Sequence, residues 1–123
     1  MTANPVHNSI DYTEITVTDL GAAKEFYGSV FAWKFTDYGD AYVGFTCPGR
    51  ISESGGFLLN EEPRPAGGPF VLLYTDDLDA TAAAISVAGG QVTQGPYDFP
   101  GGRRLHFADP SGNELGAWSV PSL

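Results

Sequence analysis

The feature that most constrains the fold of this chain is an internal repeat. In each half, an aspartate suited to cap a helix precedes a leucine, at Asp19–Leu20 and again 58 residues later at Asp77–Leu78. With the same offset, the alternating positions of the first opening strand also find partners: Thr13, Ile15 and Val17 fall on Val71, Leu73 and Thr75. Because pattern, cap and register agree, we interpret the halves as a true repeat. The alternative is a chance likeness between two α+β halves.

Each half is predicted to contain one strand, one helix and about three further strands. Period-two alternation indicates the strands, and apolar residues at helical spacing indicate the helices. We therefore expect two modules, residues 8–60 and 69–120, in one domain with a Pro- and Gly-rich linker at 61–68. The expected helices are 20–31 and 78–88, and the expected strands are 12–18, 41–46, 55–59, 70–75, 91–93, 103–108 and 114–120.

The charge balance restricts the classes of partner. Fifteen acidic and six basic residues give a net charge of −9, which disfavours nucleic acid and anionic membranes as partners. No apolar run is long enough to span a bilayer, and the first residues lack the basic and apolar segments of a signal peptide. A single cysteine, Cys47, excludes an internal disulfide framework. We expect an acidic, cytoplasmic protein.

Five segments resemble the vicinal-oxygen-chelate superfamily, which includes glyoxalase I, bleomycin-resistance proteins and extradiol dioxygenases. They are Glu14–Leu20, Glu25–Trp33, Tyr74–Asp79, Ala88–Gly90 and Phe107–Trp118, the last containing an Asp-Pro-Ser-Gly-Asn turn. The resemblance covers nearly the whole chain. It implies an α+β fold in which two βαβββ modules form curved mixed sheets around a cavity, and it implies a homodimer.

Metal-dependent members of this superfamily hold a divalent ion with His and Glu side chains on the first and last strand of each module. Counting from the matching motifs places these positions at Tyr12, Leu58, Phe70 and Gly116. None supplies an imidazole or a carboxylate, and a phenol with a pKa near 10 is a poor ligand at neutral pH. We expect neither a metal nor another cofactor.

The strand face that does not pack under the helix should line the ligand site. Glu14 is the single acid on this face of either opening strand, so it is a candidate to orient a cation or to act as a base; the alternative is a carboxylate in solvent, at a dimer contact or bonded to a tyrosine hydroxyl. The glycine at position 116 should leave a gap in the lining. The predicted site residues are Tyr12, Glu14, Thr16, Leu58, Phe70, Leu72, Tyr74, Gly116 and Trp118.

Other chemically interesting residues have simpler explanations. His106 has no evident nucleophile or orienting acid nearby in the sequence, so a strand histidine bonded to backbone or water is the preferred interpretation. Arg103 could meet an anionic group or be a solvated hairpin residue. The acidic run Asp76, Asp77 and Asp79 is better explained by helix capping than by cation binding.

Taken together, the sequence predicts a metal-free protein that binds a small organic molecule. By its resemblance to antibiotic-binding members, it is expected to sequester an aromatic or cationic compound such as an antibiotic. One alternative is a lyase, isomerase or tailoring enzyme of the same fold that uses Glu14 or Tyr12. A second is a regulatory or structural module whose cavity is filled.

Overall fold

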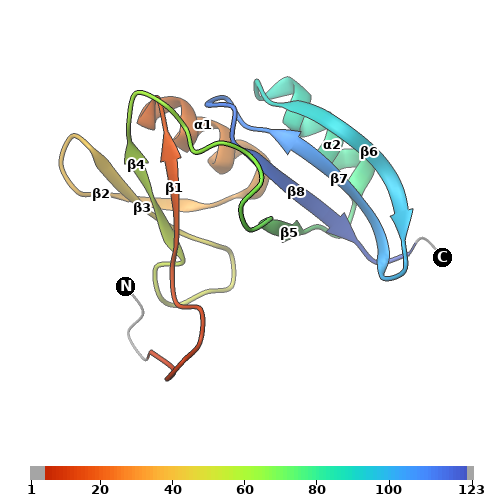
Figure 1. The fold of residues 1–123 in the computed structure, drawn as a ribbon, viewed down its shortest axis with the longest axis horizontal. Helices are drawn as coiled ribbons and strands as arrows, with labels where there is room; N and C mark the ends of the chain where they lie inside the picture. The colour runs from red at the N-terminus through yellow and green to blue at the C-terminus, as the bar shows by residue number, and fades with distance from the viewer. Residues whose placement is uncertain (1–4, 122–123) are drawn as a thin grey trace. The chain divides into compact units, whose positions relative to one another are not determined.

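The computed structural model describes residues 5–121, and the chain forms two compact units that divide between Arg64 and Pro65 (Figure 1). The division falls inside the predicted linker. Each unit is a four-stranded mixed sheet with one helix, so the expected α+β class is confirmed.

Unit 1, the part up to Arg64, follows the βαβββ order. Its strands lie in the order β1-β4-β3-β2, with β1 parallel to β4 and the other neighbours antiparallel. Its elements are β1 (Thr13–Val17), α1 (Leu20–Phe31), β2 (Lys34–Asp37), β3 (Tyr42–Thr46) and β4 (Gly55–Leu59).

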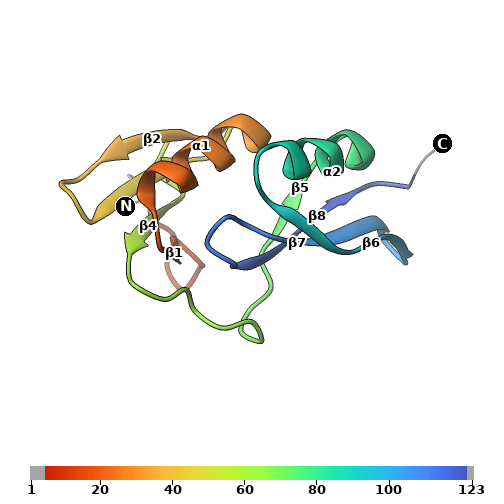
Figure 2. The same cartoon turned by 90° about the horizontal axis from the view of Figure 1, so that it is seen from above.

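Unit 2, from Pro65 onward, repeats this topology. Its strands lie in the order β5-β8-β7-β6, again with a parallel first pair, and Figure 2 shows α2 along one face of the sheet. Its elements are β5 (Leu72–Tyr74), α2 (Leu78–Val87), β6 (Gln91–Phe99), β7 (Gly102–Ala108) and β8 (Glu114–Ser119).

Both helices begin at the predicted aspartates. Asp19 accepts a hydrogen bond of 2.9 Å from the backbone N–H of Ala22, and Asp77 accepts one of 3.0 Å from Ala80. An N-cap of this kind satisfies a backbone donor that the first turn leaves unpaired. The repeated cap therefore has the same physical role in both units.

The core of each unit lies between its helix and one sheet face. In unit 1, Ile15 and Val17 are buried as predicted, and Trp33 stacks between Tyr27 at 4.6 Å and Phe45 at 4.3 Å. In unit 2, buried aliphatic and aromatic residues from α2, β7 and β8 take the same place; they are Leu78, Ile85, Leu105, Phe107, Leu115 and Ala117. Val71 and Leu73, expected in this core, are half-buried.

Three strands differ from the expectation. Strand β2 was not predicted because its residues, Lys34–Asp37, are mostly exposed and lack an apolar face. Strand β6 runs to Phe99 instead of ending at Thr93, since the second of two register shifts against β7 accommodates its Gly-Pro pair on an edge strand. Strand β5 is shorter than the predicted 70–75. Within residues 5–121 no helix has the length and apolarity needed to cross a membrane.

Candidate ligand-binding faces of the two sheets

We call the sheet face opposite the helix of the same unit its far face. On unit 1, the strand register places Glu14 beside Gly56 and Thr16 beside Leu58 on this face. Tyr42 and Gly44 of β3 pair with Leu58 and Gly56, so they share it. Thr16 is nevertheless buried, and the Arg64 side chain approaches its hydroxyl at 3.4 Å.

A tyrosine–glutamate network covers the far face of unit 1. Glu53, which precedes β4, accepts a 2.6 Å hydrogen bond from the Tyr12 hydroxyl and a 2.7 Å hydrogen bond from the Tyr38 hydroxyl. The Tyr42 hydroxyl lies 3.1 Å from the Tyr12 oxygen and 3.1 Å from Glu14 Oε2, so its proton can serve either acceptor. The network thus joins residues next to β1, β2, β3 and β4.

Two glycines provide the space for this network. Gly44 and Gly56 are cross-strand partners on the far face. A Cβ atom at Gly44 would overlap the Glu53 carboxylate, and a Cβ atom at Gly56 would overlap the Tyr42 hydroxyl. The absence of two side chains at one point of the sheet therefore lets Glu53 and Tyr42 lie across it.

The hydrogen bonds also shift the acid–base properties of the network. Burial alone would raise the pKa of Glu53, but the hydrogen bonds from Tyr12 and Tyr38 outweigh it and lower the pKa below its ordinary value of 4.5. Burial, together with the hydrogen bond to Glu53, raises the pKa of Tyr12 far above its ordinary value of 10.0. At neutral pH, Glu53 is therefore an acceptor and Tyr12 a neutral donor.

Glu14 has partners, as one of its sequence-based interpretations allowed. Its Oε2 accepts from Tyr42, and its Oε1 lies 4.0 Å from Arg64 Nη2. The carboxylate side chain remains 40% exposed. It is therefore accessible to a ligand, although Arg64 offsets part of its charge.

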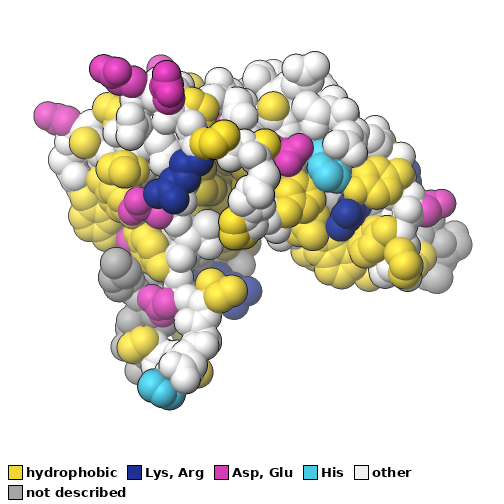
Figure 3. All heavy atoms as spheres, viewed as in Figure 1, with side chains coloured by type: hydrophobic (Ala, Val, Ile, Leu, Met, Phe, Trp, Pro, Cys, Tyr) yellow, Lys and Arg dark blue, Asp and Glu magenta, His cyan; other side chains and the backbone are white. Residues whose placement is uncertain are grey.

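The far face of unit 2 is mainly aromatic. Phe70 stacks on His106 with ring centroids 4.5 Å apart, and Trp118 contacts Tyr74 edge-on at 5.1 Å and Phe99 at 6.2 Å. Tyr74 is 50% exposed. Figure 3 shows histidine and basic side chains among hydrophobic side chains on this part of the molecule, with acidic atoms beside the histidine.

The gap predicted at Gly116 is occupied, which corrects the sequence-based expectation. A Cβ atom at Gly116 would stand 2.6 Å from Phe70 Cζ and 2.7 Å from Leu72 Cδ2. Phe70 turns its ring over the glycine because no side chain opposes it there. The space above Gly116 is therefore filled by the Phe70 ring and is not a gap in the lining.

Four polar side chains form a chain of contacts across the same face. Arg104 Nε donates a 2.6 Å hydrogen bond to the Tyr97 oxygen, which lies 2.7 Å from His106 Nε2. The Tyr97 hydroxyl therefore connects Arg104 to His106, and it can donate to Nε2 or accept from it according to the imidazole tautomer. Nδ1 is buried without a hydrogen-bond partner among the described residues, and Glu114 Oε2 lies 3.7 Å from it.

Strand pairing corrects one residue of the predicted ligand set. Gly116 is the partner of Leu72, and the equivalent of Leu72 in unit 1 is Glu14, whose partner is Gly56. The counterpart of Gly116 is thus Gly56, and Leu58 corresponds instead to Trp118. The 58-residue offset does not apply to the last strands, because the segments that precede them differ in length by two residues between the units.

The residues at the four positions that correspond to metal ligands in metal-dependent members of the superfamily do not fit a divalent metal. Tyr12, Gly56, Phe70 and Gly116 offer one neutral phenol and no imidazole or carboxylate. The described part of the chain contains no group of three or more His, Cys, Asp or Glu residues placed to hold a metal ion. No metal-assisted step can be derived from this geometry.

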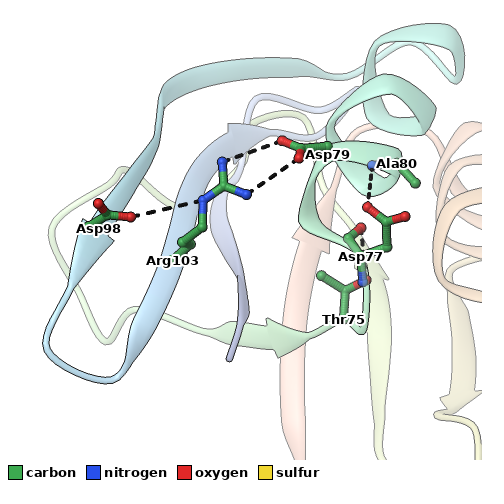
Figure 4. Close-up of polar contacts among 6 residues, drawn as sticks. All are labelled: Thr75, Asp77, Asp79, Ala80, Asp98 and Arg103. Carbon is green, nitrogen blue, oxygen red and sulfur yellow. Dashed lines mark hydrogen bonds and ion pairs between the residues drawn. The ribbon is translucent and has the colours of Figure 1, made fainter. Parts of the chain in front are cut away.

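The acidic run at the start of α2 caps the helix and binds one arginine (Figure 4). Asp77 is the N-cap, and Asp79 accepts two hydrogen bonds of 3.4 Å from Arg103, which also lies 4.0 Å from Asp98. Arg103 therefore pairs with carboxylates on the helix side of the sheet. It is not on the far face, and its anionic partners among the described residues are these protein carboxylates.

Sequence reasoning missed several residues of the two faces, above all Glu53, Tyr42, Tyr97 and Arg104. Glu53 and Tyr97 lie in segments interpreted as turns or loops, so strand alternation could not be used to assign their side chains to a sheet face. Arg104 could have been found, because it lies one alternation from His106 on a predicted strand and opposite Trp118.

Two βαβββ units, each with a polar or aromatic far face, define a repeated α+β fold. The chain belongs to the Glyoxalase/Bleomycin resistance protein/Dioxygenase superfamily, whose family model matches residues 9–116. The resemblance stated from the sequence motifs is thereby confirmed.

Individual relatives agree with this assignment. The chain is 31% identical over 119 residues to a glyoxylase-like domain-containing protein of Didymella fabae, covering 88% of this chain and 91% of that protein. It is 31% identical over 117 residues to the anthracycline biosynthesis protein DnrV of Streptomyces peucetius, covering 81% of this chain and 42% of DnrV. The chain thus spans less than half the length of DnrV.

Among solved structures, one similar protein is TnmS3, an antibiotic binding protein from Streptomyces sp. CB03234. The TM-score is 0.68 at 25% sequence identity, and the match covers 95% of this chain and 99% of TnmS3. The fold similarity extends over both units.

Proposed function

We propose that this protein binds a small organic molecule with aromatic character without the help of a metal, and that it acts by sequestering a compound such as an antibiotic. The observation that carries the proposal is the far face of unit 2. There, the positions that hold metal ligands in other members carry Phe70 and Gly116, and aromatic rings surround them.

The physical basis of binding is stacking and apolar contact. Tyr74 and Trp118 lie partly exposed and edge to face, so a planar ligand can pack against either ring. Each favourable aromatic pair contributes about 0.5–1.5 kcal/mol beyond the burial of its area. Two or three such contacts suit reversible binding of a flat molecule.

The relatives support the same class of ligand. TnmS3 is an antibiotic binding protein and DnrV an anthracycline biosynthesis protein, and each matches four-fifths or more of this chain. The absence of a fitting ligand set favours binding over the metal-dependent chemistry of other members.

An enzyme that uses Tyr12 or Glu14 is less well supported. The raised pKa of Tyr12 keeps its phenol neutral, so it is a poor base at neutral pH. Glu14 already accepts from Tyr42 and lies near Arg64. A regulatory module with a filled interior is less consistent with a half-exposed Tyr74. We also propose a homodimer, following the superfamily resemblance, and a cytoplasmic location, following the single cysteine and the composition.

Native mass spectrometry tests the proposal. The purified protein should carry a co-purified organic adduct, or take one up from a panel of planar aromatic compounds, with and without a chelator. Chemical recovery of the compound unchanged after incubation distinguishes sequestration from turnover. Uptake that requires an added divalent metal, or conversion of the bound compound, would contradict the proposal.

A further inference from the structure

The two adjacent arginines of β7 have opposite environments. Arg103 is on the helix side and contacts the carboxylates of Asp79 and Asp98. Arg104 is on the far face of unit 2, where its Nε donates to Tyr97, and its guanidinium meets no carboxylate among residues 5–121. Its charge is therefore not offset by a neighbouring acid, in a chain with fifteen acidic and six basic residues.

Aromatic rings hold the Arg104 guanidinium in place. Its Cζ atom lies 5.3 Å from the Phe99 ring centroid, 5.4 Å from that of Tyr97 and 5.9 Å from that of Phe70. Cation–π contacts of this kind favour the charged group over the rings without neutralising it. Because only Nε is committed to Tyr97, the two terminal nitrogens remain available as donors.

The neighbouring polar groups fix this orientation. Tyr97 accepts from Arg104 and lies 2.7 Å from His106 Nε2, while His106 stacks on Phe70. The carboxylate of Glu114 lies at the other end of this chain of contacts, 3.7 Å from His106 Nδ1. The guanidinium is therefore a preoriented donor on an aromatic surface.

We infer that the far face of unit 2 binds a planar aromatic compound through an anionic oxygen group, a carboxylate or a phenolate, that accepts from the terminal nitrogens of Arg104. The rings of Phe70, Phe99 and Trp118 supply the contacts for the aromatic part. This inference rests on the proposed function and names the chemical class of its ligand. A guanidinium is suited to the group because its planar N–H fork matches two acceptor lone pairs.

The net charge of −9 sharpens this expectation. The protein as a whole does not attract anions, so selectivity for one must come from a local group. Among residues 5–64, the far face of unit 1, where Glu14 and Glu53 lie, offers one cationic donor, Arg64, which already approaches Glu14. Binding of an aromatic anion should thus depend on one residue.

Isothermal titration calorimetry with two matched probes, anthraquinone-2-carboxylate and anthraquinone-2-carboxamide, tests the inference. The probes share the same ring system and differ in charge. The wild type should bind the carboxylate about tenfold more tightly than the carboxamide, since a charge-assisted hydrogen bond is stronger than a neutral one. Arg104→Gln should abolish the preference by weakening the carboxylate alone.

Arg103→Gln is the matched control, because it removes the same charge from the adjacent residue on the opposite face. It should leave the preference intact, whereas an effect of overall charge would change both variants equally. Arg104→Lys, which keeps the charge and loses the fork, should give an intermediate preference. The far-UV circular dichroism spectrum of each variant reports whether the fold is preserved.

Three results would overturn the inference in different ways. Equal binding of both probes by the wild type would show that the ligand needs no anionic group. It would leave the proposal of metal-free binding of aromatic compounds unaffected. Failure of the wild type to bind either probe would overturn the inference and also count against the proposed function. If a folded Arg104→Gln variant still preferred the carboxylate probe over the carboxamide, the carboxylate would not bind at Arg104.

Discussion

The Tyr12 hydroxyl donates a 2.6 Å hydrogen bond to Glu53, and this contact joins the residue before β1 to the loop before β4. Tyr38 donates to the other carboxylate oxygen at 2.7 Å. One carboxylate thus connects three segments that are distant in sequence, over a sheet position that Gly44 leaves free.

Glu53 should therefore make stability depend on pH on the acidic side. Its folded-state pKa is lowered below the ordinary 4.5, so the ionised carboxylate stabilises the fold above that value and the contribution is lost as pH falls through the folded-state pKa. Glu53→Gln should cost about 1 kcal/mol of unfolding free energy at neutral pH, reduced by solvent exposure of the site.

Urea unfolding of wild type and Glu53→Gln at several pH values measures this difference. The two curves should converge under acidic conditions. Glu61→Gln, an exposed acid in the linker, is the control and should match the wild type throughout. A constant difference between wild type and Glu53→Gln across the acidic range would show that the carboxylate charge is not what stabilises the network.

Gly116→Ala should disturb the aromatic face of unit 2. The added methyl group would stand 2.6 Å from Phe70 Cζ, so the ring must move and its stack on His106 must change. Overpacking of this kind costs about 1–3 kcal/mol. Thermal unfolding measures the cost, and Gly68→Ala, where an added Cβ meets nothing within 4 Å, should be close to neutral. Equal stability of the two variants would mean that Phe70 does not rest on Gly116.

Metal addition should have no specific effect. Protein purified without an affinity tag should contain no stoichiometric Ni, Zn, Fe or Mn, and adding these ions should not raise the melting temperature as a bound ligand would. Elemental analysis and thermal shift assays measure the two quantities. One ion per chain that is lost on substitution of Tyr12 would contradict the assignment of the far faces as metal-free.

A homodimer is expected in solution. Light scattering at micromolar concentration should give twice the mass of the 13.0 kDa chain. Since the superfamily resemblance is the basis of this prediction, a monomer under these conditions would remove the homodimer from the proposal and leave the ligand inference in place.

The repeat explains why the fold could be predicted in detail. The caps at Asp19 and Asp77 fix the start of each helix, and alternation in Ile15 and Val17 fixes the buried face. These are local signals that depend on the few residues around them. Strand β2 escaped prediction because an exposed edge strand needs no apolar pattern.

The candidate site was less predictable, because its geometry depends on contacts between distant segments. No local pattern indicates that Glu53 will cover Gly44 or that Phe70 will cover Gly116. Arg103 and Arg104 are adjacent residues of the same type. Strand alternation alone places Arg104 among aromatic rings and Arg103 between carboxylates. Residue type alone therefore could not distinguish the environments of the two arginines.

The central claim is that a planar organic ligand binds on the far face of unit 2 without a metal, and its most direct test is a tryptophan-fluorescence titration with anthraquinone-2-carboxylate in the presence of a chelator. Trp118 lies on that face, whereas Trp33 is only 6% exposed in the core of unit 1. We predict saturable quenching that persists in Trp33→Phe and disappears in Trp118→Phe. Quenching that survives in Trp118→Phe, or that appears only after a divalent metal is added, would contradict the account.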